Sequence, residues 1–441
     1  MTATVVLEEL LFEEVTDELV GELQRGGRPF GREDQRALGH SLLNQALARH
    51  AQRCVETGAD LLDPQAEDAL ARRVMDRLFA SGALQPYLED PTVMEINANG
   101  AAVTWIVRTD GSKERGAPLA PSNAALVDLV RTLAAEAGRE GGIERRFDSA
   151  HPRLDLQLPN GDRLFAVMGV SRVPIVSIRR HNFLELITLD QLHEAGMLDV
   201  ALRDLLAAMV RARCNVIISG GTGVGKTTLL RAMCNAIAPE ERLVVIEDSP
   251  ELGLDRFADA HPDLVCVAQR EANTEGEGEV SIADLTRWML RANPDRVIVG
   301  EVRGAEVIPM LNAMTQGNQG SMCSVHANSS KAAFGKLATY AVQAPERLPL
   351  DATNQLIASA VSFVVHLERV TGGDRKQRRV VASVRELVGH EGPLVVSNEV
   401  FRPGSDRRAV PATPLQPETL DALEAAGFDP SLLDRGAGWW A

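Results

Sequence analysis

Residues 220–228 read Gly-Gly-Thr-Gly-Val-Gly-Lys-Thr-Thr, and they separate the apolar run Val216–Ile218 from the helix-forming run Leu229–Met233. A strand, a glycine-rich loop and a helix in this order are typical of a P-loop. Because glycine has no side chain, backbone N–H groups of the loop can converge on phosphate oxygens, and the helix N-terminus adds partial positive charge there. The stretch therefore predicts an α/β domain that binds a nucleoside triphosphate.

Two side chains of this loop add what the backbone cannot supply. The Lys226 ammonium can reach the β- and γ-phosphates, and the Thr227 hydroxyl is placed to ligate Mg²⁺. The alternative is a glycine-rich turn without a ligand, and the flanking strand and helix signals argue against it. The predicted nucleotide-binding residues are Gly220, Gly221, Thr222, Gly223, Val224, Gly225, Lys226, Thr227 and Thr228.

Composition narrows the class of protein further. A chain of 441 residues, 45% of them hydrophobic, is long enough for two or three domains with sizeable cores. A net charge of -15 argues against sequence-independent binding to DNA, which needs clustered Lys and Arg, so no direct nucleic-acid partner is expected. The 5 cysteines show no metal-like spacing, which indicates reduced thiols and no zinc site.

Targeting signals are weak. The N-terminus lacks the basic region of a signal peptide, and no uncharged apolar run reaches the ~20 residues that a membrane-spanning helix needs. We therefore expect a cytoplasmic protein whose role at a membrane, if it has one, is peripheral.

The composition of the sequence and the spacing of its apolar residues divide the chain into four parts. Residues 1–88 carry Leu and Ala at helical spacing, and residues 89–182 alternate like the strands of a small α+β domain, with a hairpin about Asn160-Gly161. Residues 183–390 hold the P-loop domain, and positions 183–200 suggest only a link into it. Residues 391–441 form a C-terminal tail, in which a frayed end is favoured over docking for Trp439-Trp440.

Four apolar runs of the P-loop domain predict a parallel sheet whose ligands gather at the carboxyl ends of the strands. The runs cover residues 216–219, 243–246, 297–300 and 322–325. The second run is closed by Glu247, the third by Glu301 and the fourth by His326. A carboxylate there can hold the hydration shell of Mg²⁺ or polarise an attacking water, so Glu247 and Glu301 are our acid–base and metal candidates, with a solvated helix cap as the alternative.

His326 has a less specific signal. It follows the polar stretch Gln316–Gly320, which could report on the γ-phosphate by hydrogen bonding. A lone histidine is more often a satisfied core residue, so both interpretations stay open.

Several longer motifs around these residues are similar to those of the type II/type IV secretion ATPase superfamily, over roughly residues 88–390. The strongest resemblance is to the CpaF-like branch that drives Tad/Flp pilus assembly. The matching segments are the Asp box 246–252, the Walker B box 295–304, the His box 320–328 and the stretch 275–285, which resembles this branch in particular.

The resemblance implies a RecA-like ATPase domain in a ring-shaped homohexamer. It implies that Glu301 is the catalytic base, with Glu247 helping to order Mg²⁺ through water, and that His326 belongs to the site. It also implies a position at the inner face of the cytoplasmic membrane, where the protein would drive an inner-membrane platform protein of a pilus or secretion system.

Arginines are expected to complete such a site from another domain or subunit, because a planar guanidinium neutralises charge on the γ-phosphoryl oxygens. By motif position the candidates are Arg179 and Arg270. Arg146, Arg153 and Arg163 are weaker candidates, for which surface salt bridges are the alternative.

Other functions remain open. One is a related ring ATPase of a type II or a conjugation-type type IV system, although the four-cysteine zinc element common in type II motors is absent from the sequence. Another is a P-loop switch that binds nucleotide with little turnover. A small-molecule kinase is disfavoured, because the sequence indicates no pocket for an acceptor.

We predict that Lys226→Ala weakens binding of Mg-ATP by at least roughly 10- to 100-fold, the loss expected when a charged hydrogen-bond donor to phosphate is removed. Isothermal titration calorimetry measures this directly. Wild-type affinity in the variant would show that the loop is not a nucleotide site.

Overall fold

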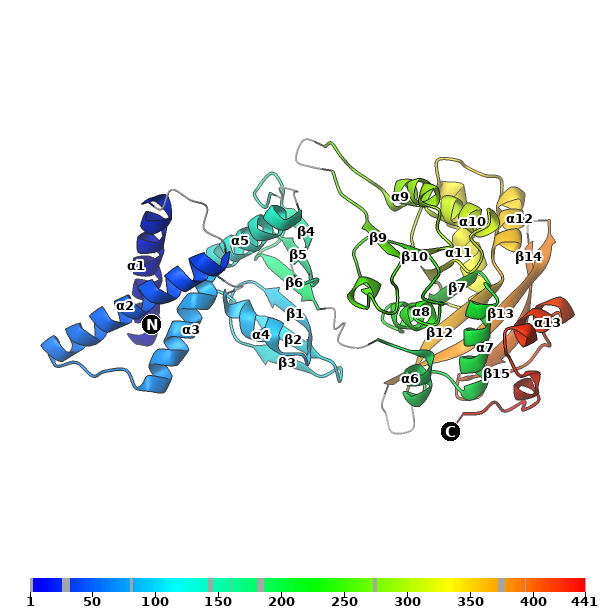
Figure 1. The fold of residues 1–441 in the computed structure, drawn as a ribbon, viewed down its shortest axis with the longest axis horizontal. Helices are drawn as coiled ribbons and strands as arrows, with labels where there is room; N and C mark the ends of the chain where they lie inside the picture. The colour runs from blue at the N-terminus through cyan, green and yellow to red at the C-terminus, as the bar shows by residue number, and fades with distance from the viewer. Residues whose placement is uncertain are drawn as a thin grey trace. The chain divides into compact units, whose positions relative to one another are not determined.

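The computed structural model describes residues 3–25, 32–79, 82–141, 146–158, 160–180, 186–272, 276–371, 377–392 and 394–440 (Figure 1). The chain divides into two compact units, Met1–Asn182 and Phe183–Ala441, which are described separately below.

The first unit begins with the helices α1 (Ala3–Arg25), α2 (Arg32–Thr57) and α3 (Pro64–Phe79). They pack around a core of their own, in which side chains such as Val15, Leu43 and Leu70 are fully buried. The 3-10 turn η1 (Gly82–Leu84) and the short helix α4 (Gln85–Glu89) follow. The predicted helical N-terminal region is therefore confirmed.

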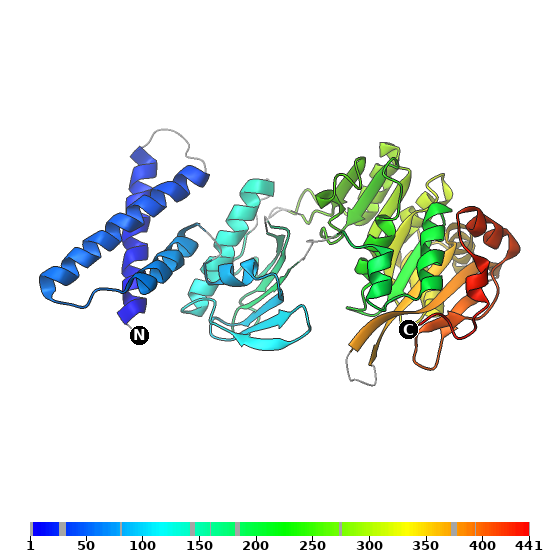
Figure 2. The same ribbon diagram turned by 60° about the horizontal axis from the view of Figure 1, so that its bottom comes forward.

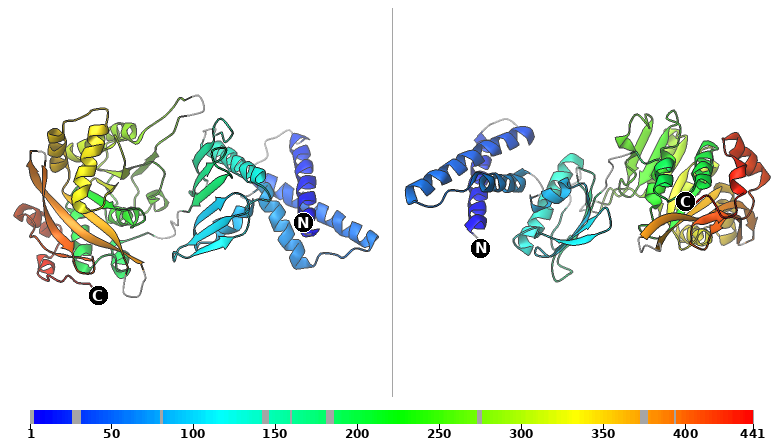
Figure 3. Two further views of the ribbon diagram at one scale, coloured as in Figure 1. Left: turned by 180° about the vertical axis from the view of Figure 1, so that it is seen from behind. Right: turned by 90° about the horizontal axis from the view of Figure 1, so that it is seen from below.

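The rest of this unit is a six-stranded antiparallel sheet in the order β3-β2-β1-β6-β5-β4. Residues on one face of every strand except β3 are buried with side chains of α5 in one core, and Figure 3 shows α5 along the sheet. The structure confirms the predicted α+β arrangement and adds β3, whose charged residues gave no apolar alternation. The elements are β1 (Val93–Asn99), β2 (Thr104–Arg108), β3 (Lys113–Gly116), α5 (Asn123–Gly141), β4 (Arg153–Gln157), β5 (Arg163–Val167) and β6 (Ile175–Arg179).

The second unit is built on a nine-stranded sheet in the order β15-β14-β13-β12-β7-β11-β10-β8-β9. The strands from β12 to β9 in this order are parallel, and β13, β14 and β15 continue the sheet in antiparallel fashion. The predicted parallel sheet is confirmed, with β9 and β12 as further members. The strands are β7 (Val216–Gly220), β8 (Leu243–Glu247), β9 (Leu264–Ala268), β10 (Arg296–Val302), β11 (Met322–His326), β12 (Phe363–Thr371), β13 (Gln377–Glu391), β14 (Leu394–Pro403) and β15 (Ala409–Pro411).

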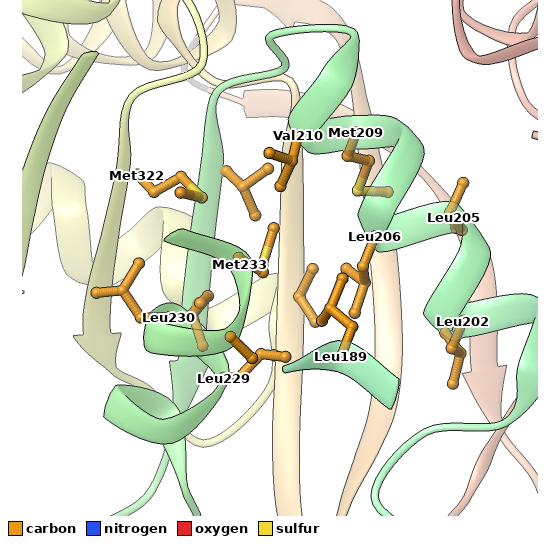
Figure 4. Close-up of a cluster of buried hydrophobic side chains, with 14 of the residues drawn as sticks. Leu189, Leu202, Leu205, Leu206, Met209, Val210, Leu229, Leu230, Met233 and Met322 are labelled. Atoms are coloured by element: carbon orange, nitrogen blue, oxygen red, sulfur yellow. The ribbon is translucent and has the colours of Figure 1, made fainter. Parts of the chain in front are cut away.

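Helices cover both faces of this sheet, which gives the RecA-like α/β fold. On one face lie α6 (Leu189–Glu194), α7 (Val200–Arg211) and α8 (Lys226–Cys234), and Figure 2 shows α7 and α8 side by side. Their apolar side chains point toward one another and toward the strands (Figure 4). The other face is covered by α9 (Ile282–Met289), α10 (Val307–Thr315), α11 (Ser330–Gln343) and α12 (Leu350–Ala360). The remaining elements are η2 (Leu254–Arg256), η3 (Leu290–Ala292), α13 (Pro417–Ala425) and η4 (Pro430–Leu433).

Positions 186–200 are not a plain link, and this corrects the sequence-based expectation. Thr188 and Gln191 form a capping box that starts α6, and Leu189 and Leu192 are buried in the core of the second unit. The capping signal Thr-x-x-Gln was present in the sequence, but the helix is too short to show a clear apolar period.

The end of the chain is also ordered into this unit, so the expectation of a frayed end for Trp439 and Trp440 is wrong. The backbone N–H of Trp439 donates to Asp199 Oδ2 at 2.8 Å, and Trp440 Nε1 donates to the carbonyl oxygen of Ala409 at 2.7 Å. Trp440 packs against the hydrophobic core, and the guanidinium of Arg408 lies over its ring.

In the part of the chain that the structure describes, no helix is both long and apolar enough to cross a membrane. The cysteines are free thiols at Cys54, Cys214, Cys234, Cys266 and Cys323.

We predict that Phe401→Ala lowers the free energy of unfolding of the second unit by about 3–5 kcal/mol, because Phe401 of β14 is fully buried in its core. Leu394→Ala is the matched control on the same strand, since Leu394 is 66% exposed, and it should change stability by less than about 0.5 kcal/mol. Amide hydrogen exchange of β13 and β14 measures both effects. Equal protection in the two variants would mean that β14 does not stabilise the sheet.

Candidate nucleotide site

The loop between β7 and α8 has a backbone conformation that requires glycine. Gly223 and Gly225 have φ values of 72° and 99°, in the left-handed region that other residues avoid. A Cβ atom on Gly220 would lie 2.7 Å from the carbonyl oxygen of Leu367 and 2.7 Å from Val224 Cγ2. Side chains are thus excluded at these glycine positions by strain or by contact, as a backbone cradle for phosphate needs.

The side chain of Lys226, the first residue of α8, contacts the backbone of this loop. Its Nζ atom donates to the carbonyl oxygens of Gly221 at 3.0 Å and Gly220 at 3.3 Å, and it lies 3.3 Å from His326 Nδ1. Burial lowers the pKa of the Lys226 ammonium, and the nearby carboxylate of Glu301 partly opposes this shift. The cation therefore stands at the loop together with a histidine from the neighbouring strand.

Because the strands are parallel, their carboxyl ends, which carry the predicted residues, lie along the same side of the sheet. His326 at the end of β11 pairs with Gly220 at the end of β7, and β10 follows as the next strand. His326 Nε2 lies 2.7 Å from Glu301 Oε1. Lys226, Glu301 and His326 thus form one cluster, which strands distant in the sequence bring together.

The two oxygens of Glu301 have different surroundings. Oε2 accepts a hydrogen bond of 2.8 Å from Arg303 Nε, and the same guanidinium donates through Nη1 to Asp248 Oδ2 at 2.6 Å. Oε1 is buried and makes no hydrogen bond of good geometry with the described residues, although it approaches His326 to an ion-pair distance. An oxygen in this state suits a water molecule or a hydrated Mg²⁺ ion as its partner.

Arg303 lies in the Walker B box 295–304, but the sequence alone gave it no role in the site. It follows Glu301 by two positions and comes directly after the last residue of β10, and in an extended chain side chains two apart lie on the same face. This spacing was the available signal. The contact with Asp248 depends instead on β8 and β10 being neighbours.

Glu247 is buried and differs from Glu301 in what surrounds it. Its Oε1 accepts hydrogen bonds of 2.9 Å from the backbone N–H groups of Glu251 and Leu252, so it holds the turn that follows β8. Burial raises the pKa of this carboxyl to about 8, although the two backbone donors act in the opposite direction. Gly300 of β10 allows this packing, because a Cβ there would lie 3.0 Å from Glu247 Cγ.

His326 is half-buried, and this lowers the pKa of its imidazole. Desolvation is the largest cause; the negative charge of Glu301 opposes it, and the positive charge of Lys226 adds to it. The neutral imidazole is therefore favoured near pH 7, with one ring nitrogen able to donate and the other able to accept.

The polar stretch Gln316–Gly320 lies at the amino ends of the strands, whereas the P-loop lies at their carboxyl ends. The expectation that this stretch reports on the γ-phosphate is therefore wrong. Gly320 N–H donates to the side chain of Asn215, the residue before β7, at 2.9 Å. Asn318 donates to the carbonyl oxygen of Pro294 at 2.5 Å, before β10. The length of β7 puts this stretch roughly 13 Å from the P-loop, because each strand residue rises about 3.3 Å.

Of the two stronger arginine candidates, only Arg270 belongs to the unit that holds the P-loop, and the strand that it follows is not a neighbour of β7. Arg270 follows β9, the edge strand, which β11, β10 and β8 separate from β7, and its Nε donates to the carbonyl oxygen of Gly278 at 2.7 Å. Arg179 ends β6 in the first unit, where it is exposed and lies between Glu95 and Arg163 in the sheet register.

The weaker candidates have ordinary surroundings. Arg163 Nη2 pairs with Asp155 at 3.1 Å, Arg153 approaches the same carboxylate to 3.6 Å, and Arg146 is exposed.

The strand order and the loop define a RecA-like P-loop protein. Comparison with known sequences is more specific, since the family described as "Type II/IV secretion system protein" matches residues 80–398. The chain belongs to this family. The resemblance to the secretion ATPase superfamily is thereby confirmed, and the narrower CpaF-like assignment is not.

Two relatives found by sequence agree with this assignment. A putative conjugal transfer protein of Mycobacterium tuberculosis is 36% identical over 73% of this chain and 88% of its own length. Conjugal transfer protein TrbB of Rhizobium radiobacter is 29% identical over 71% of this chain and 90% of its own. Among solved structures, the VirB11 ATPase from the Brucella suis type IV secretion system is 26% identical, covers 69% of this chain and 95% of its own, and has a TM-score of 0.36.

We predict that Glu247 makes stability fall with rising pH in protein free of metal and nucleotide. Between its ordinary pKa of 4.5 and its folded value of about 8, the folded state keeps a proton that the unfolded state releases, so this contribution to stability is lost as pH rises through that window. The variant Glu247→Gln cannot titrate there. Denaturant titrations at pH 5 and pH 8 should therefore show wild type losing stability relative to the variant, and an equal difference at both pH values would contradict the raised pKa.

Proposed function

We propose that this protein is an ATP-hydrolysing motor of a secretion system. The observation that supports this best is the cluster of Lys226, Glu301 and His326 beside the P-loop, with the buried Glu301 Oε1 left without a hydrogen bond of good geometry. A carboxylate at that point can accept a proton from a water molecule that attacks the γ-phosphate.

Each predicted residue has a task in this proposal. The loop amides and Lys226 bind the phosphates, and Thr227, half-buried at the start of α8, ligates Mg²⁺. An Mg²⁺ ion held there would neutralise charge that develops on the phosphate oxygens. Glu301 orients and deprotonates water, and His326 holds Glu301 in place and contacts the γ-phosphate. Glu247 acts on the Mg²⁺ hydration shell, from a position in which its Oε1 is held by two backbone donors.

We further propose that sites are completed between subunits of a homohexamer. Arg270 follows the edge strand of the nine-stranded sheet, beyond reach of the P-loop in the same unit. The nucleotide site that it can complete is therefore that of a neighbouring subunit. Arg179 is exposed at a strand end of the N-terminal domain and is assigned to the γ-phosphate in the same way. The four parts of the chain, 1–88, 89–182, 183–390 and 391–441, remain our proposed division.

The cellular setting follows from the relatives. Their names refer to conjugal transfer and type IV secretion, which favours a conjugation-type machine over the Tad/Flp pilus that the sequence motifs suggested. We propose that the motor acts in the cytoplasm, at the inner face of the cytoplasmic membrane, on an inner-membrane partner of that machine.

A nucleotide switch with little turnover is a second candidate. It is favoured by the ion pair between Arg303 and Glu301, which competes with a water molecule for the carboxylate.

We predict that Glu301→Gln keeps Mg-ATP binding and lowers ATP hydrolysis by roughly 10²- to 10⁴-fold, because the amide cannot accept the proton. ATPase activity per subunit should also rise steeply with protein concentration in wild type, since sites completed between subunits need assembly. Phosphate release measured over a concentration series checks both statements.

The matched control is Glu418→Gln, an exposed position in the first turn of α13, which should leave turnover unchanged. Activity that is independent of concentration and of Glu301 would contradict the motor. Tight ATP binding without turnover in wild type would support the switch.

A further inference from the structure

Arg369 of β12 contacts the P-loop from the side opposite to Glu301. Its Nη2 atom donates to the carbonyl oxygen of Gly223 at 2.9 Å, and its Nη1 donates to Gln377 Oε1 at 3.3 Å. The approach is close enough that a Cβ atom on Gly223 would lie 2.8 Å from Nη2. An exposed guanidinium is thus held in a fixed position at the middle of the loop.

A second arginine lies beside it. Arg379 of β13 is the cross-strand partner of Arg369, so both side chains stand on the same face of the sheet. Arg379 Cδ would lie 3.4 Å from a Cβ atom on Gly225, and Met197 Cε and Leu367 Cδ2 lie at 3.1 and 3.9 Å from the same point. The β12 side of the P-loop therefore combines two arginine side chains with apolar groups.

The order of strands decides which end of a nucleotide lies on this side. Glu301 and His326 stand on β10 and β11, on one side of β7, whereas β12 is the neighbour of β7 on the other side. A γ-phosphate has to lie next to Glu301 for hydrolysis. A triphosphate in the loop then runs from Glu301 toward β12, and its nucleoside leaves the loop on the side of Arg369.

We propose that Arg369, with Arg379 beside it, forms the nucleoside-binding part of the site and stacks its guanidinium plane on the base. This inference rests on the proposed function of the loop as a nucleoside triphosphate site. A planar, delocalised cation suits the face of an aromatic base, and its bond to the Gly223 carbonyl keeps the plane in place. Because stacking does not read the edge of a base, this contact discriminates only weakly between nucleotides.

The test compares ATP with inorganic tripolyphosphate, which lacks the nucleoside, both with Mg²⁺ and by isothermal titration calorimetry of the full chain. Loss of a cation–base contact of about 0.5–2 kcal/mol corresponds to roughly 2- to 30-fold weaker binding. We expect Arg369→Ala to weaken ATP binding by that factor and to leave tripolyphosphate binding unchanged within about twofold. Arg402→Ala, an exposed arginine on β14, is the matched control and should affect neither ligand.

The variant Arg369→Lys separates loss of stacking from a disturbance of the loop caused by truncating the side chain. Lysine keeps the charge and can donate to the Gly223 carbonyl, but it lacks the plane, so this variant should lose affinity for ATP and not for tripolyphosphate. Equal losses for the two ligands, or wild-type ATP affinity in Arg369→Lys, would overturn the proposal and leave Arg369 as a positioning residue of the loop. Wild-type protein that binds neither ligand would instead overturn the proposed nucleotide site itself.

Discussion

The rest of the site depends on the backbone conformation of the loop from Gly220 to Gly225, which requires glycine and is contacted by residues of the neighbouring strands. Leu367 of β12 packs directly against Gly220, and Arg369 holds the carbonyl of Gly223, while His326 of β11 stands beside Lys226. The loop is therefore held from both neighbouring strands of β7. Because parallel strands end at the same edge, this one constraint also places the ends of β8 and β10 at the loop.

The two glutamates of the site show how surroundings divide roles between similar side chains. Glu247 is buried behind Gly300, and its partners are backbone donors of the following turn, so it resists ionisation and stabilises local structure. Glu301 faces Lys226 and His326 and shares the guanidinium of Arg303 with Asp248. An arginine between two carboxylates links β8 to β10, so movement of either strand end changes the partners of Glu301.

The part of the nine-stranded sheet beyond β12 is formed and covered by residues from the C-terminal part of the chain. Strands β13, β14 and β15 extend the sheet beyond β12, and Trp440 covers the core beside Ala409. Asp199 caps α7 through the N–H of Leu202 and also accepts the N–H of Trp439, so the start of the second unit is bonded to its end. The strand that carries Arg369 is thereby an internal strand of the sheet and not an edge.

The sequence by itself determined the P-loop, the parallel strands around it and the residues at their ends, because glycine positions, apolar runs and strand-terminal carboxylates are local patterns. It also indicated the secretion ATPase family. The strand order was decided only by the tertiary structure, and with it the closeness of His326 to Glu301, the pairing of Arg303 with Asp248 and the contact of Arg369 with Gly223. These contacts join residues far apart in the chain, whose proximity depends on which strands become neighbours, and no local pattern carries that information.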